Sequence, residues 1–227
     1  MSNKPEKKGD VRQRLRKADA KMKKRKKAVI GTLPPFMYIV TEGTVTEVTY
    51  IEGFAKNINM RYGAFSTRDR IVVKGFGKSC LTLLEEAERT VGKVCPKAEV
   101  VWLVYDKDDF PKDAFDNTQF SAESRRDTRK YRVAWSNESI ELWFLLHFQE
   151  MKSEVSRKQY IKLLEAYCDY RKNDPELFEK LYPRTEEAIN RADKLFHSYE
   201  KNTAPSAMCP ATRMHELVKD LMGYMRK

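Results

Sequence analysis

Residues 100–111 read VVWLVYDKDDFP, an apolar run that ends abruptly in Asp106, Asp108 and Asp109. VVWLVY is continuously apolar rather than alternating, which is typical of a central strand covered on both faces. Three carboxylates after such a strand repel one another, and a divalent cation is the ordinary way to offset that repulsion. A solvated acidic turn is the simpler alternative for D-x-D-D taken alone. The stretch therefore predicts a buried strand that ends at a charged site.

Short apolar runs alternate with amphipathic segments after Pro34-Pro35. This alternation indicates βα units around a largely parallel sheet. Further strands are predicted at 36–40, 71–74 and 131–135, and helices at 46–58, from Ser79, and at 139–148, 156–170, 185–201 and 211–224. We expect an α/β fold with a mainly parallel four-stranded sheet flanked by helices. The predicted parts are an N-terminal arm at 1–30, an α/β core at 31–150 and a helical annex at 151–227 packed on the core.

The positive charge of the chain is concentrated at its beginning. The chain has 227 residues and a formal net charge of +11, and residues 1–30 hold 13 Lys or Arg but three Asp or Glu. The remaining 197 residues hold 31 basic and 30 acidic residues and are nearly neutral. This basic arm, flexible or helical, is expected to contact nucleic-acid phosphates or an acidic protein surface. A solvated tail that aids solubility is the alternative.

The composition favours a soluble, cytoplasmic protein. No run approaches the roughly 20 apolar residues of a membrane span, and the lysine-rich start lacks the apolar region of a secretory signal. The four cysteines form no C-x-x-C pair, so we expect reduced, mostly buried thiols rather than a zinc site.

A second carboxylate follows another predicted strand: Glu42 comes directly after 36–40. Neighbouring strands lie about 4.8 Å apart, so Glu42, Asp106 and Asp108 can converge at the carboxyl ends of the strands. Carboxylate oxygens suit Mg²⁺ or Mn²⁺. Glu47, in the first turn of the next helix, is expected either to bind a second metal or to stabilise the helix N-terminus.

Further candidates carry two interpretations each. Glu141 lies in the apolar helix SNESIELWFLLHF, where it either completes the acidic site or satisfies a structural partner such as an Arg. His147 in the same helix is a structural histidine or a general base. Lys74 and Lys78 flank a Gly-rich turn and either hold a scissile phosphate or belong to a solvated loop.

The motifs together resemble a known arrangement. YIVTEGTVTEVTYIEGF at 38–54 followed by VVWLVYDKDDFP is similar to the Toprim arrangement, in which a Glu and a later D-x-D bind Mg²⁺ for phosphodiester chemistry. More closely, the chain resembles the RloB-like family of prokaryotic defence loci. The matching segments are Glu42-Gly43 with Thr46-Glu47, Asp106 to Asp109, Ser136-Asn137 with Glu141, Trp143, His147 and Phe148, and Cys209 to Thr212.

The resemblance implies a Toprim-like core and a Mg²⁺-dependent nuclease that acts on DNA or tRNA in anti-phage defence, with an ATPase partner of the ABC or AAA type. Glu42, Asp106 and Asp108 are then the expected metal ligands, with Glu47 and Glu141 as further catalytic residues. Two alternatives stay open: a catalytically silent module that docks on an ATPase, and a primase-like nucleotide-handling enzyme. Homodimer formation is also left open.

Overall fold

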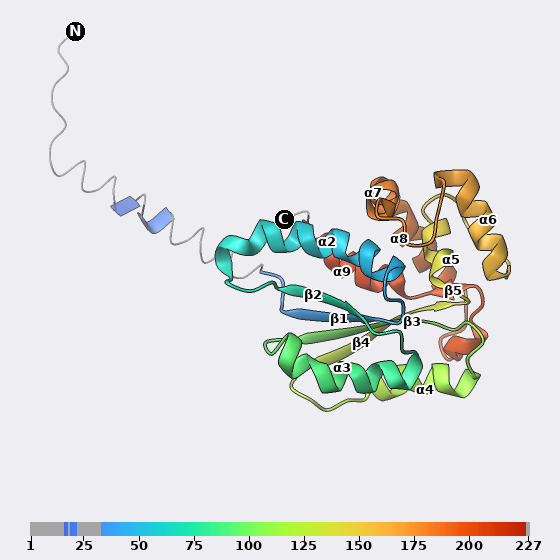
Figure 1. The fold of residues 1–227 in the computed structure, drawn as a ribbon, viewed down its shortest axis with the longest axis horizontal. Coiled ribbons are helices and arrows are strands. Elements are labelled where there is room, and N and C mark those ends of the chain that lie inside the picture. Colours follow the sequence, from blue (N-terminus) through green and yellow to red (C-terminus); the bar gives the residue numbers. More distant parts are fainter. Residues whose placement is uncertain (1–15, 18, 22–32, 226–227) are drawn as a thin grey trace, which may run out of the picture. The chain divides into compact units, whose positions relative to one another are not determined.

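The computed structural model describes residues 16–17, 19–21 and 33–225 (Figure 1). Most of the predicted basic arm lies outside these residues, so its binding role stays a prediction. The described residues from Pro35 onward form one compact unit.

The sheet confirms the predicted α/β class and adds a strand to the four expected. Its strands are β1 (Met37–Thr41), β2 (Ile71–Gly75), β3 (Val100–Asp106), β4 (Lys130–Asn137) and β5 (Ala211–Thr212), in the order β2-β1-β3-β4-β5. The first four are parallel and β5 pairs antiparallel with β4. The helix predicted from 211 begins instead at Met214, because Ala211 and Thr212 pair with Asn137 and Ser136.

Helices cover both faces of the sheet. α2 (Thr46–Tyr62) and α9 (Met214–Met225) lie on one face, while α3 (Cys80–Val94) and α4 (Lys112–Glu123) lie on the other (Figure 1). α4 was not expected from the sequence. Its buried positions are Phe115, Thr118 and Ala122, a narrow stripe that leaves a weak apolar pattern.

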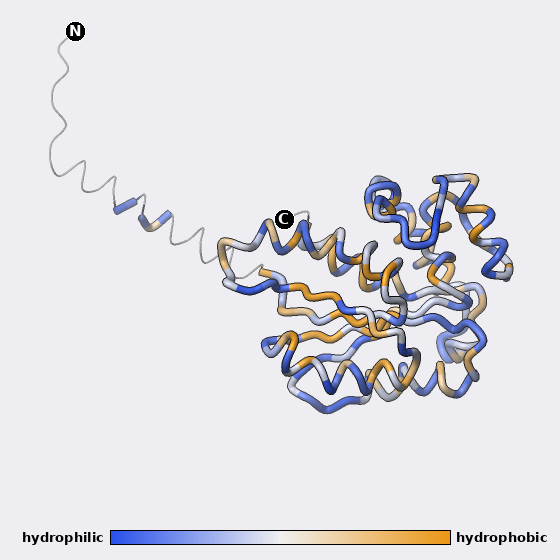
Figure 2. Tube along the Cα trace, in the orientation of Figure 1, coloured by the Kyte–Doolittle hydropathy of each residue, from blue (hydrophilic) through white to orange (hydrophobic). Residues whose placement is uncertain are grey.

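Burial on both faces explains the continuous apolar runs. Every residue of β3 after Val100 is buried. Val101, Leu103 and Tyr105 pack into the cluster that includes Leu83 and Phe115 of the α3–α4 layer. The tube in Figure 2 shows the apolar strands lying inside, between the more polar outer surfaces of the helices.

The remaining helices gather beyond the carboxyl ends of the strands (Figure 1). They are α5 (Ile140–Leu145), α6 (Arg157–Cys168), α7 (Leu177–Leu181) and α8 (Thr185–Phe196), with 3₁₀ turns at Tyr182–Arg184 and Pro205–Ala207. Another 3₁₀ turn, Gly63–Phe65, connects the end of α2 to β2. α5 and α8 are shorter than predicted. α6 begins where expected, since Ser156 and Gln159 form a capping box at its start.

The strand order fixes where a site can form. From β1 the chain passes to β2 on one side and then to β3 on the other, so the order reverses between β1 and β3. In open α/β sheets, ligands bind in the crevice beyond the carboxyl ends of strands at such a switch point. Glu42 follows β1 and Asp106 ends β3, so both predicted carboxylates lie at this position.

All four cysteines are free, and Cys80 and Cys95 are buried. Within the described part of the chain, no helix is both long and apolar enough to cross a membrane.

Candidate active site

Glu42 and Asp106 are held together by backbone geometry. Parallel pairing sets Thr41 beside Val104, and the Glu42 amide donates to the Val104 carbonyl oxygen over 2.8 Å. The Asp106 amide then donates to Oε2 of Glu42 over 3.3 Å. The sheet register therefore brings these two residues, 64 positions apart, into contact.

Burial makes both carboxylates reluctant to ionise. It raises the pKa of Glu42 to about 7, and the charges of Asp108 and Glu47 add to this rise while the Asp106 amide opposes it. Asp106 is 4% exposed, and its Oδ2 accepts a hydrogen bond from the Ile140 amide over 3.1 Å. Burial raises the pKa of Asp106 well above its ordinary value, with further contributions from the charges of Glu47 and Glu141.

Glu47 folds back over the turn that carries Glu42. It is buried in the first turn of α2, and burial together with the charge of Glu141 raises its pKa. A Cβ at Gly43 would overlap the Glu47 carboxylate. Glycine at this position therefore leaves the space in which the Glu47 carboxylate lies.

A second glycine brings β2 against the same turn. The amides of Phe76 and Gly77 donate to the carbonyl oxygens of Thr41 and Glu42. A Cβ at Gly75 would lie 2.5 Å from the Gly43 carbonyl oxygen, closer than side chains tolerate. The E-G pair of the sequence thus packs against the glycine-rich turn after β2.

Asp108 lies on the far side of the cavity and faces a cation. The Lys107 and Asp108 amides donate to the carbonyl oxygens of Ser136 and Glu138 over 2.9 and 3.0 Å, which pins the DKDD turn to the chain after β4. Asp108 has a φ of +34°, a conformation that non-glycine residues rarely adopt. Its two carboxylate oxygens accept hydrogen bonds from Nη1 of Arg157 over 3.0 and 3.1 Å.

Arg157 also pairs with Glu141, which is 2% exposed. Its Nη2 donates to Oε1 of Glu141 over 3.3 Å, and its Nε lies 3.2 Å from Oε2. Tyr170 donates to the same Oε1 over 3.4 Å. Oε2 itself accepts no hydrogen bond from the described residues, although it is buried. The negative charges of Glu141 and Asp108 raise the pKa of Arg157 despite its partial burial.

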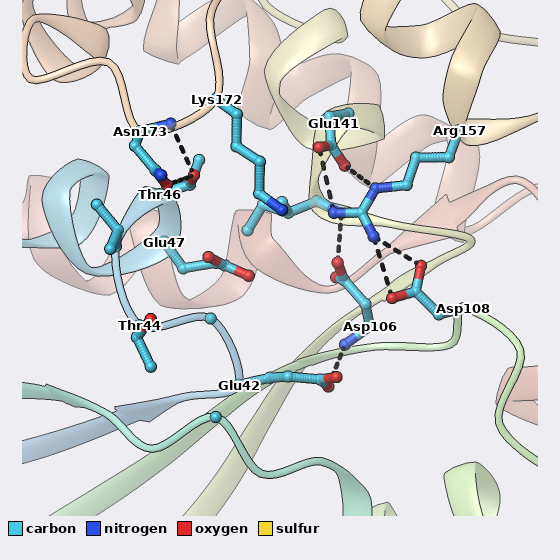
Figure 3. A pocket seen from close by; sticks show the side chains of 14 residues that line it. Glu42, Thr44, Thr46, Glu47, Asp106, Asp108, Glu141, Arg157, Lys172 and Asn173 are labelled. Atoms are coloured by element: carbon cyan, nitrogen blue, oxygen red, sulfur yellow. Dashed lines mark hydrogen bonds and ion pairs between the residues drawn. The ribbon is translucent and has the colours of Figure 1, made fainter.

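These side chains line one cavity of about 440 Å³ (Figure 3). Its lining comprises residues 42–47, Gly77, Asp106, Asp108, Ile140, Glu141, Arg157, Lys172 and Asn173. All five predicted acidic residues are included. Figure 3 shows the carboxylates of Glu47, Asp106 and Asp108 around the same space.

The other sequence candidates lie elsewhere. Lys74 and Lys78 do not belong to this lining, which takes Gly77 from the same turn. His147 is buried in the core, where its Nδ1 lies 3.0 Å from the Trp143 carbonyl oxygen and its Nε2 lies 3.4 Å from the Tyr50 hydroxyl. Burial lowers the pKa of His147 to about 3. Asp109 is exposed.

Sequence reasoning missed Arg157, Lys172 and Asn173. The Asn173 amide donates to Oγ1 of Thr46 over 3.2 Å, and that hydroxyl donates to Oδ1 of Asn173 over 3.0 Å. The expected Arg partner of Glu141 exists, and the capping motif at 156–159 could have placed Arg157 at a helix start. The sequence carries no signal that joins 172–173 to a turn more than 120 residues earlier.

The donor chemistry fits a hard divalent cation. The cavity offers carboxylate oxygens in excess of its two cations, and the buried Oε2 of Glu141 accepts no hydrogen bond from the described residues, although it lies in an ion pair with Nε of Arg157. Among the described residues, however, no three His, Cys, Asp or Glu side chains are arranged so that they could hold a metal ion as they stand. Asp108 and Glu141 instead pair with Arg157. Metal binding by Glu42, Asp106 and Asp108 stays a prediction.

Comparison with known proteins identifies the family of the chain. The model of the family described as RloB-like protein matches residues 37–221. No curated protein and no solved structure matches the chain. The chain therefore belongs to the RloB-like protein family, and the family match covers the sheet and every element that lines the cavity.

Proposed function

We propose that this RloB-like protein is a metal-dependent nuclease that hydrolyses phosphodiester bonds in nucleic acid. The observation that carries the proposal is the contact between Glu42 and Asp106 at the switch point between β1 and β3, with Glu47, Asp108 and Glu141 around the same cavity. Burial raises the pKa values of Glu42, Glu47, Asp106 and Asp108, and a cluster of such carboxylates in a cavity is typical of functional sites. A purely structural role would leave their mutual repulsion without a benefit.

The residues divide into three roles. Glu42 and Asp106 would hold Mg²⁺ or Mn²⁺, with Asp108 as a third ligand, and the cation would polarise the phosphate and stabilise charge on the leaving oxygen. Glu47 and Glu141 are available to orient the attacking water or to bind a second cation. Arg157 keeps Asp108 and Glu141 in place on the opposite wall. The sheet ends preorganise these groups before substrate arrives.

The wider role rests on family membership and on the basic arm. We propose that the arm at 1–30 gives non-specific affinity for DNA or tRNA, and that cleavage serves anti-phage defence together with an ATPase partner. Non-specific affinity of this kind falls steeply with salt.

One observation favours the silent docking module as a second candidate. Arg157 already pairs with Asp108 and Glu141, and no three described carboxylates form a ready metal site. In that case, the acidic cavity would be a structural inheritance in a protein that acts by binding a partner.

The test is to incubate purified protein with plasmid, linear DNA and total tRNA in Mg²⁺, Mn²⁺ or EDTA. Glu42→Gln keeps the shape of the side chain and removes its charge, and Glu85→Gln, at an exposed position of α3, is the matched control. We expect metal-dependent cleavage by the parent and by Glu85→Gln and no cleavage by Glu42→Gln. Cleavage that persists in Glu42→Gln, or in EDTA, would refute the proposed metal site, whereas no cleavage by the parent would favour the silent module.

A further inference from the structure

The cavity has one cation without a partner. Lys172 lies in its lining, and Figure 3 shows its side chain extending from the α6–α7 connection toward the space between Glu47 and Asp106. It makes no hydrogen bond or ion pair with any described residue, although its charge acts on Glu47. By contrast, the cavity's other cation, Arg157, is committed to Asp108 and Glu141. The ammonium donors of Lys172 are therefore free for a ligand.

The loop that carries Lys172 is fixed from both sides. Asn173, with a φ of +65°, exchanges two hydrogen bonds with Thr46 at the start of α2. Asp174 accepts from the Glu176 amide over 2.9 Å and from Nζ of Lys180 over 2.6 Å. A charged group on a preorganised loop loses less entropy when it binds an anion. Lys172 is thus held at the rim of the cavity and is still unpaired.

We propose that Lys172 binds the anionic oxygen of the substrate phosphodiester group and holds it against the acidic wall formed by Glu42, Asp106 and Glu47. This inference rests on the proposed nuclease function and names the phosphate-binding residue of that site. It assigns to the helical annex the role that the sequence suggested for Lys74 and Lys78, which lie outside the cavity lining. Lys supplies a compact point charge with three donors, which suits a phosphate oxygen.

The chemistry of the cavity supports a lysine facing the acidic wall. A phosphodiester approaching carboxylates alone would be repelled, because both carry negative charge. A lysine on the facing wall offsets that repulsion and contacts the non-bridging oxygen, as Lys and Arg do at other phosphoryl-transfer sites. Asn173 acts as a positioning residue through the hydrogen bonds that fix the loop.

The experiment compares two short ligands of similar size, one with a charged phosphorus group and one with a neutral group. A dithymidine phosphorothioate keeps the negative charge and resists hydrolysis, whereas the dithymidine methylphosphonate is neutral. Their affinities are measured by calorimetry with the full chain in Mg²⁺, for the parent, Lys172→Gln, Lys172→Arg and Lys162→Gln. Lys162 is an exposed residue of α6 outside the cavity lining, so its variant controls for loss of one positive charge.

We expect Lys172→Gln to weaken phosphorothioate binding about tenfold, the size typical for loss of a charged hydrogen bond. Binding of the neutral ligand should change little, Lys162→Gln should match the parent, and Lys172→Arg should recover most of the affinity. Unchanged phosphorothioate binding in Lys172→Gln, or an equal loss for both ligands, overturns the inference.

The nuclease proposal and the phosphate-binding proposal fail in distinguishable ways. One outcome is that the parent cleaves nucleic acid and Glu42→Gln does not, while Lys172→Gln binds the charged ligand like the parent. In that case the nuclease proposal stands and the role proposed for Lys172 is wrong. If no nucleic acid is cleaved, the nuclease proposal fails, and the two-ligand comparison still decides whether Lys172 contacts a phosphodiester.

Discussion

The Asp106 amide donates a hydrogen bond to Oε2 of Glu42 across the ends of two adjacent parallel strands. This contact places the half-buried carboxyl group of Glu42 beside the residue that carries the buried carboxyl group of Asp106. Because the β1–β3 pair is also the switch point of the sheet, the contact lies where α/β proteins bind ligands.

Glu42 should make the metal-free protein less stable as pH rises. Its pKa is about 7 in the folded protein against an ordinary 4.5, so the folded state binds more protons than the unfolded state in this interval. The stabilising contribution of the protonated group is complete below the unfolded pKa and is lost as pH rises through the folded pKa. Relative to Glu42→Gln in EDTA, the parent should therefore lose stability between these two values. The check is urea unfolding at several pH values; parallel curves for parent and variant would contradict the prediction.

Gly75→Ala should displace the turn that carries Glu42. The new Cβ would lie 2.5 Å from the Gly43 carbonyl oxygen and 2.6 Å from the Thr44 Cα, both backbone atoms that cannot move independently. We expect a loss of about 1 to 3 kcal/mol in unfolding free energy, as for other overpacked positions, and strongly reduced cleavage.

Gly92→Ala is the matched control for this change. Gly92 lies in α3 and a Cβ there meets nothing within 4 Å, so alanine should stabilise the helix by about 0.5 to 1 kcal/mol. Chemical denaturation measures both variants. Equal stability of Gly75→Ala and the parent would show that the turn is not tightly packed.

Arg157→Met should destabilise the protein by leaving Asp108 and the buried Glu141 without their cation. Losing one partner of a fully buried ion pair is costly. Because the Arg157 side chain is 34% exposed, we expect a smaller loss, of at least about 1 kcal/mol in the free energy of unfolding. Mg²⁺ should restore part of the loss if it binds the freed carboxylates. Arg89→Met, which removes an exposed helix-surface pair with Glu86, should cost less than about 0.5 kcal/mol.

The readout for Arg157→Met is thermal unfolding with and without Mg²⁺. A variant as stable as the parent would mean that the pairs contribute little. Stability unaffected by Mg²⁺ would argue against metal binding by Asp108 and Glu141.

His147 should stay neutral throughout the physiological pH range. Burial lowers its pKa to about 3, and it lies among Tyr50, Trp143 and Phe144 rather than in the cavity lining. Its imidazole NMR signals should therefore not shift between about pH 5 and about pH 8. A titration in that range would reopen the general-base interpretation.

Deleting residues 2–28 should weaken nucleic-acid binding and reduce its dependence on salt, since most of the net positive charge lies there. Anisotropy titrations over a range of salt concentrations measure both effects. Binding that is unchanged by the deletion would assign the arm to a protein partner instead.

The sequence predicted those features that depend on local patterns. Short apolar runs identified the four parallel strands, and strand ends identified Glu42 and Asp106, because parallel strands end at one edge of the sheet. It did not identify α4, whose apolar stripe is narrow, or β5, whose two residues are too few to show a period. Both elements depend on partners that are distant in the sequence.

The cations of the site show the same limit. The sequence by itself determined the acidic wall. Carboxylates follow directly after the buried strands in the sequence, so they must lie where those strands end. The tertiary structure alone decided what faces that wall: Arg157 against Asp108 and Glu141, and Lys172 on a loop tied to Thr46. The positions of Arg157 and Lys172 follow from how the helical annex packs on the sheet. That packing is set by the burial of whole helices, so the residues next to Lys172 in the sequence do not reveal it.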